Sequence, residues 1–497
     1  MTKLRGRRAT AIVAIATSVA LAATACATDA GAEGDDRISV AMMQPPKASM
    51  NPFSDDAFKL SRWSVGETLV QLNDELGIDP MLATDWEQVD DLTWTFELRE
   101  DVVFHDGTAM DAEAVVNTLD RAAAYSPPPR VLNGITIDAE ATGEYEVTIT
   151  TDSLDALLPN RLASPQLSIL AASAYLDDGS VTPVGTATGP FVLTDFSSTE
   201  ATLDRFDDYW GEPAAIAGID AYFVPDGTAR AGSLRAGEVD LAESIPVSQV
   251  ELLDPAMVNE VLQPRTTFLT LNSASGPFTD PAVRAAARDA IDTDSIVEGV
   301  YEGYADPAVG LMGPAIPWAA ELRGDVESGI EPAAIEGTPI TLATYTDRAE
   351  LPEIAVRLEQ QLEDAGFDVT QDVREYVNIE ADLLAGSFDA AIVSRNSLLD
   401  MGDPLSFMAQ DFTCDGGFNI SQLCDPAVDA LVDTALGLPI GEERQEATMA
   451  VEAAIMQLDV VVPLVHDRVV QGEANTYVDI LRDPIERRLI TVETHPA

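Results

Sequence analysis

The stretch PITLATYTDRAELPEIAVRLEQQLEDAGFDV, residues 339–369, decides the fold class. It opens with an apolar run, continues with helical periodicity from about Pro352, and returns to an apolar run after Gly366. Glycine commonly follows the last turn of a helix because it accepts a left-handed backbone. A strand, a helix and a strand in close succession are typical of a βα unit, so we expect α/β sheets.

Other segments fit this prediction. Residues 92–99 alternate large apolar side chains with threonine and charged residues, and residues 145–149 repeat the pattern. Such alternation predicts half-buried strands. Asp280-Pro281 predicts a helix start, because aspartate caps the first N–H groups and proline suits the first helical position.

The N-terminus predicts export. Basic residues from Lys3 to Arg8 precede the apolar segment 9–22, and Ala23-Thr24-Ala25-Cys26 resembles the lipobox of bacterial lipoproteins. We expect a signal peptide over 1–25, lipidation of Cys26 and a linker over 26–37. A plain secretory signal with an incidental cysteine is the alternative. No later apolar run reaches the ~20 residues of a membrane span, so the chain would be held on the outer face of the cytoplasmic membrane by its lipid.

The charge balance argues against polyanionic partners. The chain has 28 basic and 85 acidic residues, a formal net charge of −57. Nucleic acids and anionic lipid surfaces attract basic patches, so neither is an expected ligand. A generally solvated acidic surface and an adaptation to salt both fit this composition.

Two cysteines remain after Cys26. Cys414 and Cys424 are separated by nine residues, and an exported chain meets oxidising conditions. We therefore predict a disulfide, which would stabilise the fold by roughly 3 kcal/mol in the chain-entropy model. A two-cysteine metal site is the alternative, although no histidine lies nearby in the sequence.

Motifs of catalysis are missing from the sequence. The three histidines, His105, His466 and His495, lack the His-Glu-x-x-His spacing of a metal site. There is no Gly-x-Ser-x-Gly elbow, P-loop or glycine-rich dinucleotide fingerprint. The sequence therefore predicts no catalytic residue, resident metal or cofactor, and favours a protein that binds rather than converts its ligand.

Four ordered stretches make the chain resemble the extracellular solute-binding family 5, the dipeptide-, oligopeptide- and nickel-binding receptors of ABC importers. Each stretch is weak alone, but their order is specific. They are PMLATDWE (80–87) with WTFELR (94–99) and FHDGT (104–108); TGPF (188–191) with DYWG (208–211) and LRAGEVD (234–240); LN (271–272) with FTDPAVR (278–284) and AID (290–292); and DMGDP (400–404) with CDPAVD (424–429).

The resemblance implies a bilobal α/β receptor with a fold like that of type II periplasmic binding proteins. Lobe I would span 38–266, with a subdomain at about 66–182, and 470–497 would return to it. Lobe II would span 267–469. Two chain crossings, near 266–271 and 466–470, would form the hinge.

The resemblance also implies a ligand site. In peptide-binding members an aspartate at the position of Asp400 binds the peptide ammonium, and Asp403 completes that segment. Ser397 stands where those members carry a tryptophan. Arg395 is a candidate for a ligand carboxylate, and Asn419 belongs to the same stretch of the resemblance. The pair Cys414 and Cys424 would pin the loop after Asp400.

We therefore expect a monomeric import receptor that captures di- or oligopeptides and delivers them to ABC permease subunits. The same role for a sugar, a nickel chelate or a cationic metabolite is the first alternative. A secreted hydrolase or an adhesin is a more remote one.

Overall fold

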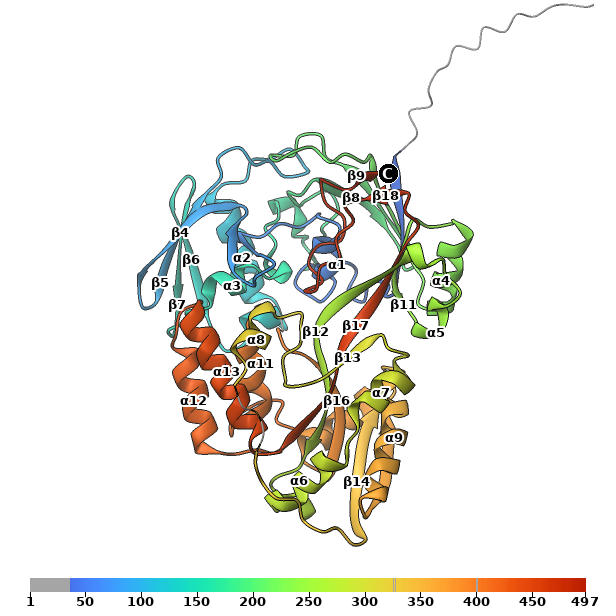
Figure 1. The fold of residues 1–497 in the computed structure, drawn as a ribbon. Helices are drawn as coiled ribbons and strands as arrows, with labels where there is room; N and C mark the ends of the chain where they lie inside the picture. The colour runs from blue at the N-terminus through green and yellow to red at the C-terminus, as the bar shows by residue number, and fades with distance from the viewer. Residues whose placement is uncertain (1–35, 325, 327, 399–400) are drawn as a thin grey trace, which may run out of the picture. The chain divides into compact units, whose positions relative to one another are not determined.

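A large mixed β-sheet dominates the chain. The computed structural model describes residues 36–324, 326, 328–398 and 401–497 (Figure 1). Within these residues, ten strands follow one another across the sheet, and β13 (Ala305–Pro307) pairs with β17 off this path. In spatial order they are β15 (Phe367–Arg374), β14 (Thr338–Tyr345), β16 (Ala390–Asn396), β12 (Val258–Leu271), β17 (Val461–Glu473), β11 (Leu241–Ile245), β1 (Arg37–Met42), β10 (Gly218–Phe223), β9 (Glu200–Arg205) and β8 (Phe191–Phe196).

The predicted strand–helix–strand unit is confirmed. β14 and β15 run parallel, and α9 (Glu350–Asp364) connects them, beginning two residues before Pro352. Gly366 follows the helix with φ 103°, and a Cβ there would stand 2.3 Å from the Ile335 carbonyl oxygen. Glycine is therefore required at this turn by both its backbone conformation and the lack of space.

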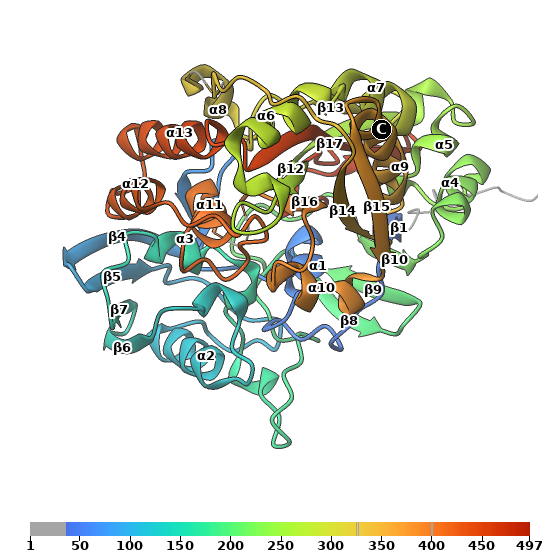
Figure 2. The same cartoon turned by 90° about the horizontal axis from the view of Figure 1, so that it is seen from below.

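Strands β12 and β17 lie side by side and connect two apolar cores (Figures 1 and 2). Phe268 and Val465 belong to a cluster that, apart from Leu76, is built from residues 268–465. A second cluster is built from residues 38–241 and from three C-terminal side chains, Ile480, Leu489 and Ile490. The β12–β17 register shifts between Leu262 and Thr266. The predicted lobe boundaries at 266–267 and 469–470 stay a prediction.

A smaller antiparallel sheet contains the predicted tryptophan strand. Its order is β4 (Ala83–Asp90), β5 (Thr93–Leu98), β7 (Glu146–Thr151) and β6 (Ile137–Gly143). Phe96 of β5 stands opposite Val147 of β7, and both are fully buried. The alternation of residues 92–99 thus places one face of β5 in the core, next to α2 (Ala112–Ala124) in the same cluster.

A buried carboxylate explains two motifs of the resemblance. Glu67 accepts hydrogen bonds from the hydroxyls of Thr188 (2.7 Å) and Tyr209 (2.8 Å) and from the indole N–H of Trp210 (3.0 Å). Burial raises the pKa of Glu67, and these three donors oppose the rise. Because a buried polar group without partners is costly, these motif residues act in the fold.

The remaining described elements are short strands and helices. Asp280 caps α6 through the Ala282 N–H at 2.9 Å, which confirms the predicted helix start.

No described helix has the length and apolar character to cross a membrane. The strands are β2 (Val70–Leu72), β3 (Ile78–Pro80), β18 (Tyr477–Val478) and β19 (His495–Pro496). The α-helices are α1 (Ala57–Arg62), α3 (Leu158–Leu162), α4 (Gly227–Ala236), α5 (Val247–Val250), α6 (Pro281–Ala290), α7 (Thr293–Val300), α8 (Pro317–Leu322), α10 (Tyr376–Leu384), α11 (Pro404–Phe412), α12 (Pro426–Leu436) and α13 (Glu442–Met456). The 3-10 turns are η1 (Arg130–Leu132), η2 (Pro165–Leu167), η3 (Ala172–Ala174), η4 (Pro255–Met257) and η5 (Pro277–Thr279).

Candidate functional site

A pocket of about 890 Å³ lies where several strands of the large sheet end. Its wall includes residues at or just beyond the ends of β1 and β16, Glu243 within β11, and residues of α1, η1 and α11. β1 and β11 are parallel neighbours, so their carboxyl ends meet at one edge. Open α/β sheets bind ligands at that edge. The volume lies within the range of small-molecule sites.

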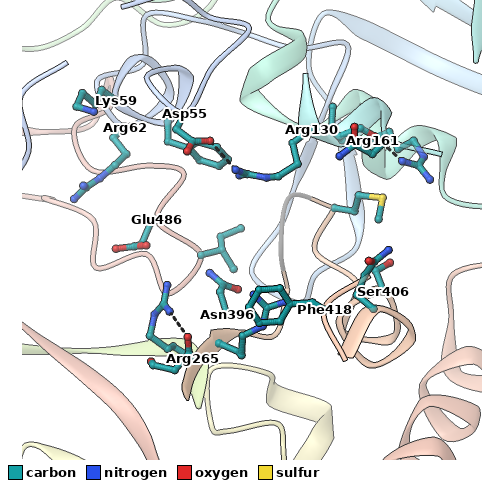
Figure 3. A pocket seen from close by; sticks show the side chains of 18 of the residues that line it. Asp55, Lys59, Arg62, Arg130, Arg161, Arg265, Asn396, Ser406, Phe418 and Glu486 are labelled. Atoms are coloured by element: carbon teal, nitrogen blue, oxygen red, sulfur yellow. Dashed lines mark hydrogen bonds and ion pairs between the residues drawn. The ribbon is translucent and has the colours of Figure 1, made fainter. Parts of the chain in front are cut away.

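The described wall of this pocket is unusually basic for so acidic a chain (Figure 3). It carries six basic and three acidic side chains, whereas acidic residues outnumber basic ones by 85 to 28 in the whole chain. Such a wall favours an anionic ligand group. The basic residues are Lys59, Arg62, Arg130, Arg161, Arg265 and Arg395, and the acidic ones are Asp55, Glu243 and Glu486.

Most of these cations already have a carboxylate partner. Lys59 pairs with Asp56 at 3.1 Å, Arg130 with Asp55 at 2.9 Å and Arg161 with Asp155 at 2.5 Å. Arg62 pairs with Glu243. Burial acts to raise the pKa of Glu243, but the Arg62 charge and the Met43 N–H outweigh burial and hold that pKa below its usual value.

Arg395 lines the pocket in a fixed position. Its Nε and Nη2 each donate to the Asp411 carboxylate at 2.7 Å, and its guanidinium lies 3.7 Å from the centre of the Phe418 ring. Burial raises the pKa of Asp411 to about 6, and the Arg395 charge opposes the rise. Two of the three guanidinium nitrogens of this predicted site residue are thus engaged by a neighbour.

Arg265 differs from the other five cations. It forms no ion pair with any acidic side chain of the described residues, and its one recorded hydrogen bond runs from Nη1 to the Ser394 carbonyl oxygen at 3.4 Å. Burial and the nearby Arg348 charge lower the pKa of Arg265, while the charges of Asp467 and Glu486 act in the other direction. Arg265 lies on β12, inside the register shift between the two connecting strands.

A tight turn carries Glu486 to the pocket. The Asp483 carboxylate accepts the backbone N–H groups of Ile485 (3.0 Å), Arg487 (2.9 Å) and Arg488 (2.8 Å). Glu486 has a left-handed backbone with φ 58° and is exposed. A glutamate in this conformation is uncommon and has to be held by its surroundings.

The other predicted site residues lie outside the described pocket wall. Ser397 donates to the Pro264 carbonyl oxygen at 3.1 Å. Asp403 is buried and pairs with Arg444 at 2.8 Å. The side-chain amide of Asn419 donates to the carbonyl oxygens of Thr413 (2.9 Å) and Leu423 (2.6 Å). The partners of these three side chains hold the local fold. Asp400 and Cys26 lie outside the described residues.

Cys414 and Cys424 are joined by a disulfide, with their Cα atoms 4.3 Å apart. The loop between them carries Phe418, which lines the pocket and stacks on Arg395. The bond therefore closes the loop that supplies an aromatic wall. In the described residues no group of three or more histidine, cysteine, aspartate or glutamate side chains is placed to hold a metal ion.

Sequence reasoning did not single out Arg265, Arg62, Arg130 or Glu486. Arg265 had a recognisable signal, because it is a single charge within the run 261–271, whose other members are apolar or uncharged. Arg130 follows three consecutive prolines, a composition that predicts a surface loop and gives no sign of a ligand contact. Glu486 is one of 85 acidic residues, and no local pattern distinguishes it.

Comparisons with known proteins agree with the resemblance and the fold class predicted from sequence. The family model "Bacterial extracellular solute-binding proteins, family 5 Middle" matches residues 77–419. The nickel-binding protein NikA of Staphylococcus aureus is 28% identical over 381 residues, which cover 74% of this chain and 76% of that protein. The glutathione-binding protein GsiB of Escherichia coli O1:K1 is 32% identical over 270 residues, about half of each chain (51% and 52%).

A solved structure extends the agreement to the fold. The crystal structure of a nickel ABC transporter protein from Bacillus halodurans superimposes with a TM-score of 0.77 at 26% identity, covering 92% of this chain and 99% of that one. The predicted α/β fold of the periplasmic-binding-protein type is thereby confirmed. The matched model, relatives and structure together show that the chain belongs to the bacterial extracellular solute-binding proteins, family 5.

Proposed function

We propose that the chain is the substrate-binding component of an ABC importer and that it captures a peptide or another amino-acid-derived solute with at least one carboxylate. Family membership supports the receptor role. The names of two relatives, a glutathione-binding and a nickel-binding protein, indicate small polar solutes. In this proposal the ligand leaves chemically unchanged, so the chain is not an enzyme.

The basic wall of the pocket is the observation that carries the ligand class. A carboxylate that enters such a site gains charge-assisted hydrogen bonds from guanidinium groups. Arg265 offers such donors and has no acidic partner in the described structure. A ligand carboxylate would therefore neutralise the positive charge of Arg265, which no described acidic side chain neutralises by an ion pair. A neutral sugar would leave that charge in place, and a cationic metabolite would add to it.

Closure of the two predicted lobes would complete the site. β12 and β17 are the strands that would bend, since their pairing is interrupted beside Arg265. Ligand contacts on both sides of the pocket would favour the closed state by their differential affinity for it. Peptide length and sequence preference would then follow from the volume that remains on closure.

Native mass spectrometry of the full chain purified from its own host, followed by calorimetry, tests this function. We expect a retained or added ligand that carries a carboxylate, with glutathione and alanine peptides of two to four residues as first probes. Ligand-dependent stabilisation should grow with concentration. The proposal is wrong if only neutral or purely cationic solutes bind, or if the recovered ligand is chemically altered.

A nickel chelate is the second candidate, because a nickel-binding relative aligns over 74% of the chain. Carboxylates of a chelating molecule would meet the same basic wall, and nickel would be cargo within that molecule. Calorimetry with a nickel–histidine complex, beside histidine alone and nickel chloride alone, separates this candidate from the peptide one.

The N-terminal sequence supports lipid anchoring at the outer face of the cytoplasmic membrane. Metabolic labelling with radioactive palmitate should mark the wild-type protein in its host and should fail to mark the Cys26→Ser variant. Equal labelling of both chains would contradict the anchor.

A further inference from the structure

Two residues of opposite charge line the pocket without forming an ion pair with any described residue. They are Arg265 of β12 and Glu486 of the C-terminal turn. The remaining cations of the described wall have carboxylate partners, and the acidic residues Asp55 and Glu243 are paired with Arg130 and Arg62. A pocket with one unpaired group of each sign is built differently from one that is simply basic.

Arg265 is placed to bind an anion. Its side chain is only partly exposed, and its recorded hydrogen bond to the Ser394 carbonyl is long, at 3.4 Å. A buried or half-buried guanidinium without a carboxylate is unfavourable, and a ligand oxyanion removes that cost. Because Arg265 lies at the register shift of β12, the ligand would contact the connecting strand itself.

Glu486 is placed to bind a cation. No hydrogen bond or ion pair of its carboxylate is recorded in the described chain, although its charge acts on both Arg62 and Arg265 and favours their protonated forms. Figure 3 shows Glu486 on the same side of the pocket as these two arginines. Arg62 forms its ion pair with Glu243, and the Glu486 charge acts on it in addition.

The turn that holds Glu486 is fixed rather than adaptable. Three backbone N–H groups bind the Asp483 carboxylate, and Ile485 packs against both large apolar clusters. A left-handed glutamate maintained by such a turn has a fixed backbone position from which its side chain lines the pocket. The unfavourable left-handed backbone of Glu486 is consistent with a role of this residue in binding.

We propose that Arg265 and Glu486 form a two-charge recognition site for a solute that carries both a carboxylate and an amine, with the carboxylate on Arg265 and the ammonium on Glu486. This inference rests on the proposed receptor function and specifies its ligand. One unpaired charge would accept any small ion of opposite sign, whereas two unpaired charges of opposite sign in one pocket favour molecules that present both groups.

Calorimetry of the full chain with matched probes tests the site. The probes are trialanine, N-acetyl-trialanine and trialanine amide, together with glutathione and N-acetyl-glutathione. In the wild-type chain, we expect N-acetylation to weaken binding at least tenfold, and amidation to weaken trialanine binding similarly. In Glu486→Gln the N-acetylation penalty should fall below threefold, and in Arg265→Gln the amidation penalty should do the same.

Matched variants control for general damage. Glu302→Gln changes another exposed glutamate with a left-handed backbone, at φ 51°, outside the pocket wall, and should keep both penalties. Arg235→Gln changes an exposed arginine at the end of α4 and should also keep them. Thermal unfolding of each variant checks that it folds.

The outcomes separate this inference from the receptor function. If free and blocked probes bind equally to the wild-type chain, the two-charge site is wrong while the receptor function stands. It is also wrong if the N-acetylation penalty persists in Glu486→Gln and disappears in Asp400→Asn, because Asp400 would then bind the amine. If no probe binds the wild-type chain, the proposed ligand class fails, and the two-charge site fails with it.

Discussion

Arg444 and Arg265 are the same residue type in two opposite situations. The Arg444 guanidinium is buried, pairs with Asp403 at 2.8 Å and donates to the carbonyl oxygens of Ala435, Leu436 and Leu438. Arg265 makes one long hydrogen bond and has no recorded ion pair in the described structure. We call Arg444 saturated, because its guanidinium donors bind groups of the fold, and Arg265 unsaturated, because most of its donors have no partner among the described residues.

The largest expected loss of stability follows from replacing the saturated arginine, Arg444. Arg444→Met leaves Asp403 buried without its counter-ion and removes the guanidinium donor from the carbonyl oxygens of Ala435, Leu436 and Leu438. Removing one partner of a buried ion pair typically costs about 3–5 kcal/mol of unfolding free energy. Urea unfolding measures the loss. Arg235→Met, at an exposed site of α4, serves as the control and should cost much less.

A smaller loss, confined to binding, is expected at the unsaturated arginine. Arg265→Gln should weaken binding of trialanine or glutathione about 10- to 100-fold, equivalent to about 1.4–2.8 kcal/mol. Its unfolding free energy should stay within about 1 kcal/mol of wild type, because no ion pair is lost. Calorimetry and urea unfolding measure the two quantities. A large loss of stability with unchanged affinity would show that Arg265 belongs to the fold.

The pH dependence of stability probes the strand next to Arg265. Thr266 donates to the Leu311 carbonyl at 2.9 Å, so the Nδ1–H of His466 donates to the Thr266 hydroxyl at 2.9 Å. Burial, with the Arg323 charge, lowers the pKa of His466 to about 4. Between this value and the ordinary 6.5 the unfolded chain binds the extra proton, so stability falls as pH falls.

His466→Gln removes that proton uptake. The decrease in unfolding free energy between pH 7 and pH 5 should shrink by about 2 kcal/mol in the variant. Urea unfolding at both pH values gives the difference, in which the other titrating groups cancel. His495→Gln, in an exposed position, is the control. An unchanged pH dependence in His466→Gln would mean that the pKa of His466 is the same in the folded and the unfolded chain.

The smallest effect is expected at an exposed pair on the pocket rim. Asp55→Asn weakens the ion pair with Arg130, whose side chain is 53% exposed. Such pairs contribute about 1 kcal/mol or less, and salt screens them. Thermal unfolding in low and high salt should therefore show a small difference that vanishes at high salt. A loss as large as that of Arg444→Met would contradict the distinction between buried and exposed pairs.

Local patterns predicted the elements better than the site. The strand–helix–strand unit at 338–374 depends on periodicity and on Gly366, which neighbouring residues alone determine. The alternation of apolar and polar side chains around Trp94 likewise predicts which face of the strand is buried. The motif residues Thr188, Tyr209 and Trp210 were recognisable, but their common partner Glu67 lies more than 120 residues before Thr188.

The charged site could not be deduced in the same way because pairing is a tertiary property. Asp403 follows a motif that suggests ligand contact, yet Arg444, 41 residues later, binds it. The engagement of Arg395 likewise depends on Asp411 and Phe418, which the fold of α11 and of the disulfide loop brings to it. Whether a charge is available to a ligand depends on the partners that the rest of the chain supplies.

A basic pocket within so acidic a chain has a consequence for association kinetics. At long range a solute of net negative charge meets the field of a chain whose formal net charge is −57, and only close to the pocket does it meet the basic wall. Mobile ions screen the distant charges within a Debye length of about 10 Å at 0.1 M salt, but act less on the enclosed contacts. Encounter should therefore become faster as ionic strength rises, the reverse of electrostatic steering, while the lifetime of the complex changes little.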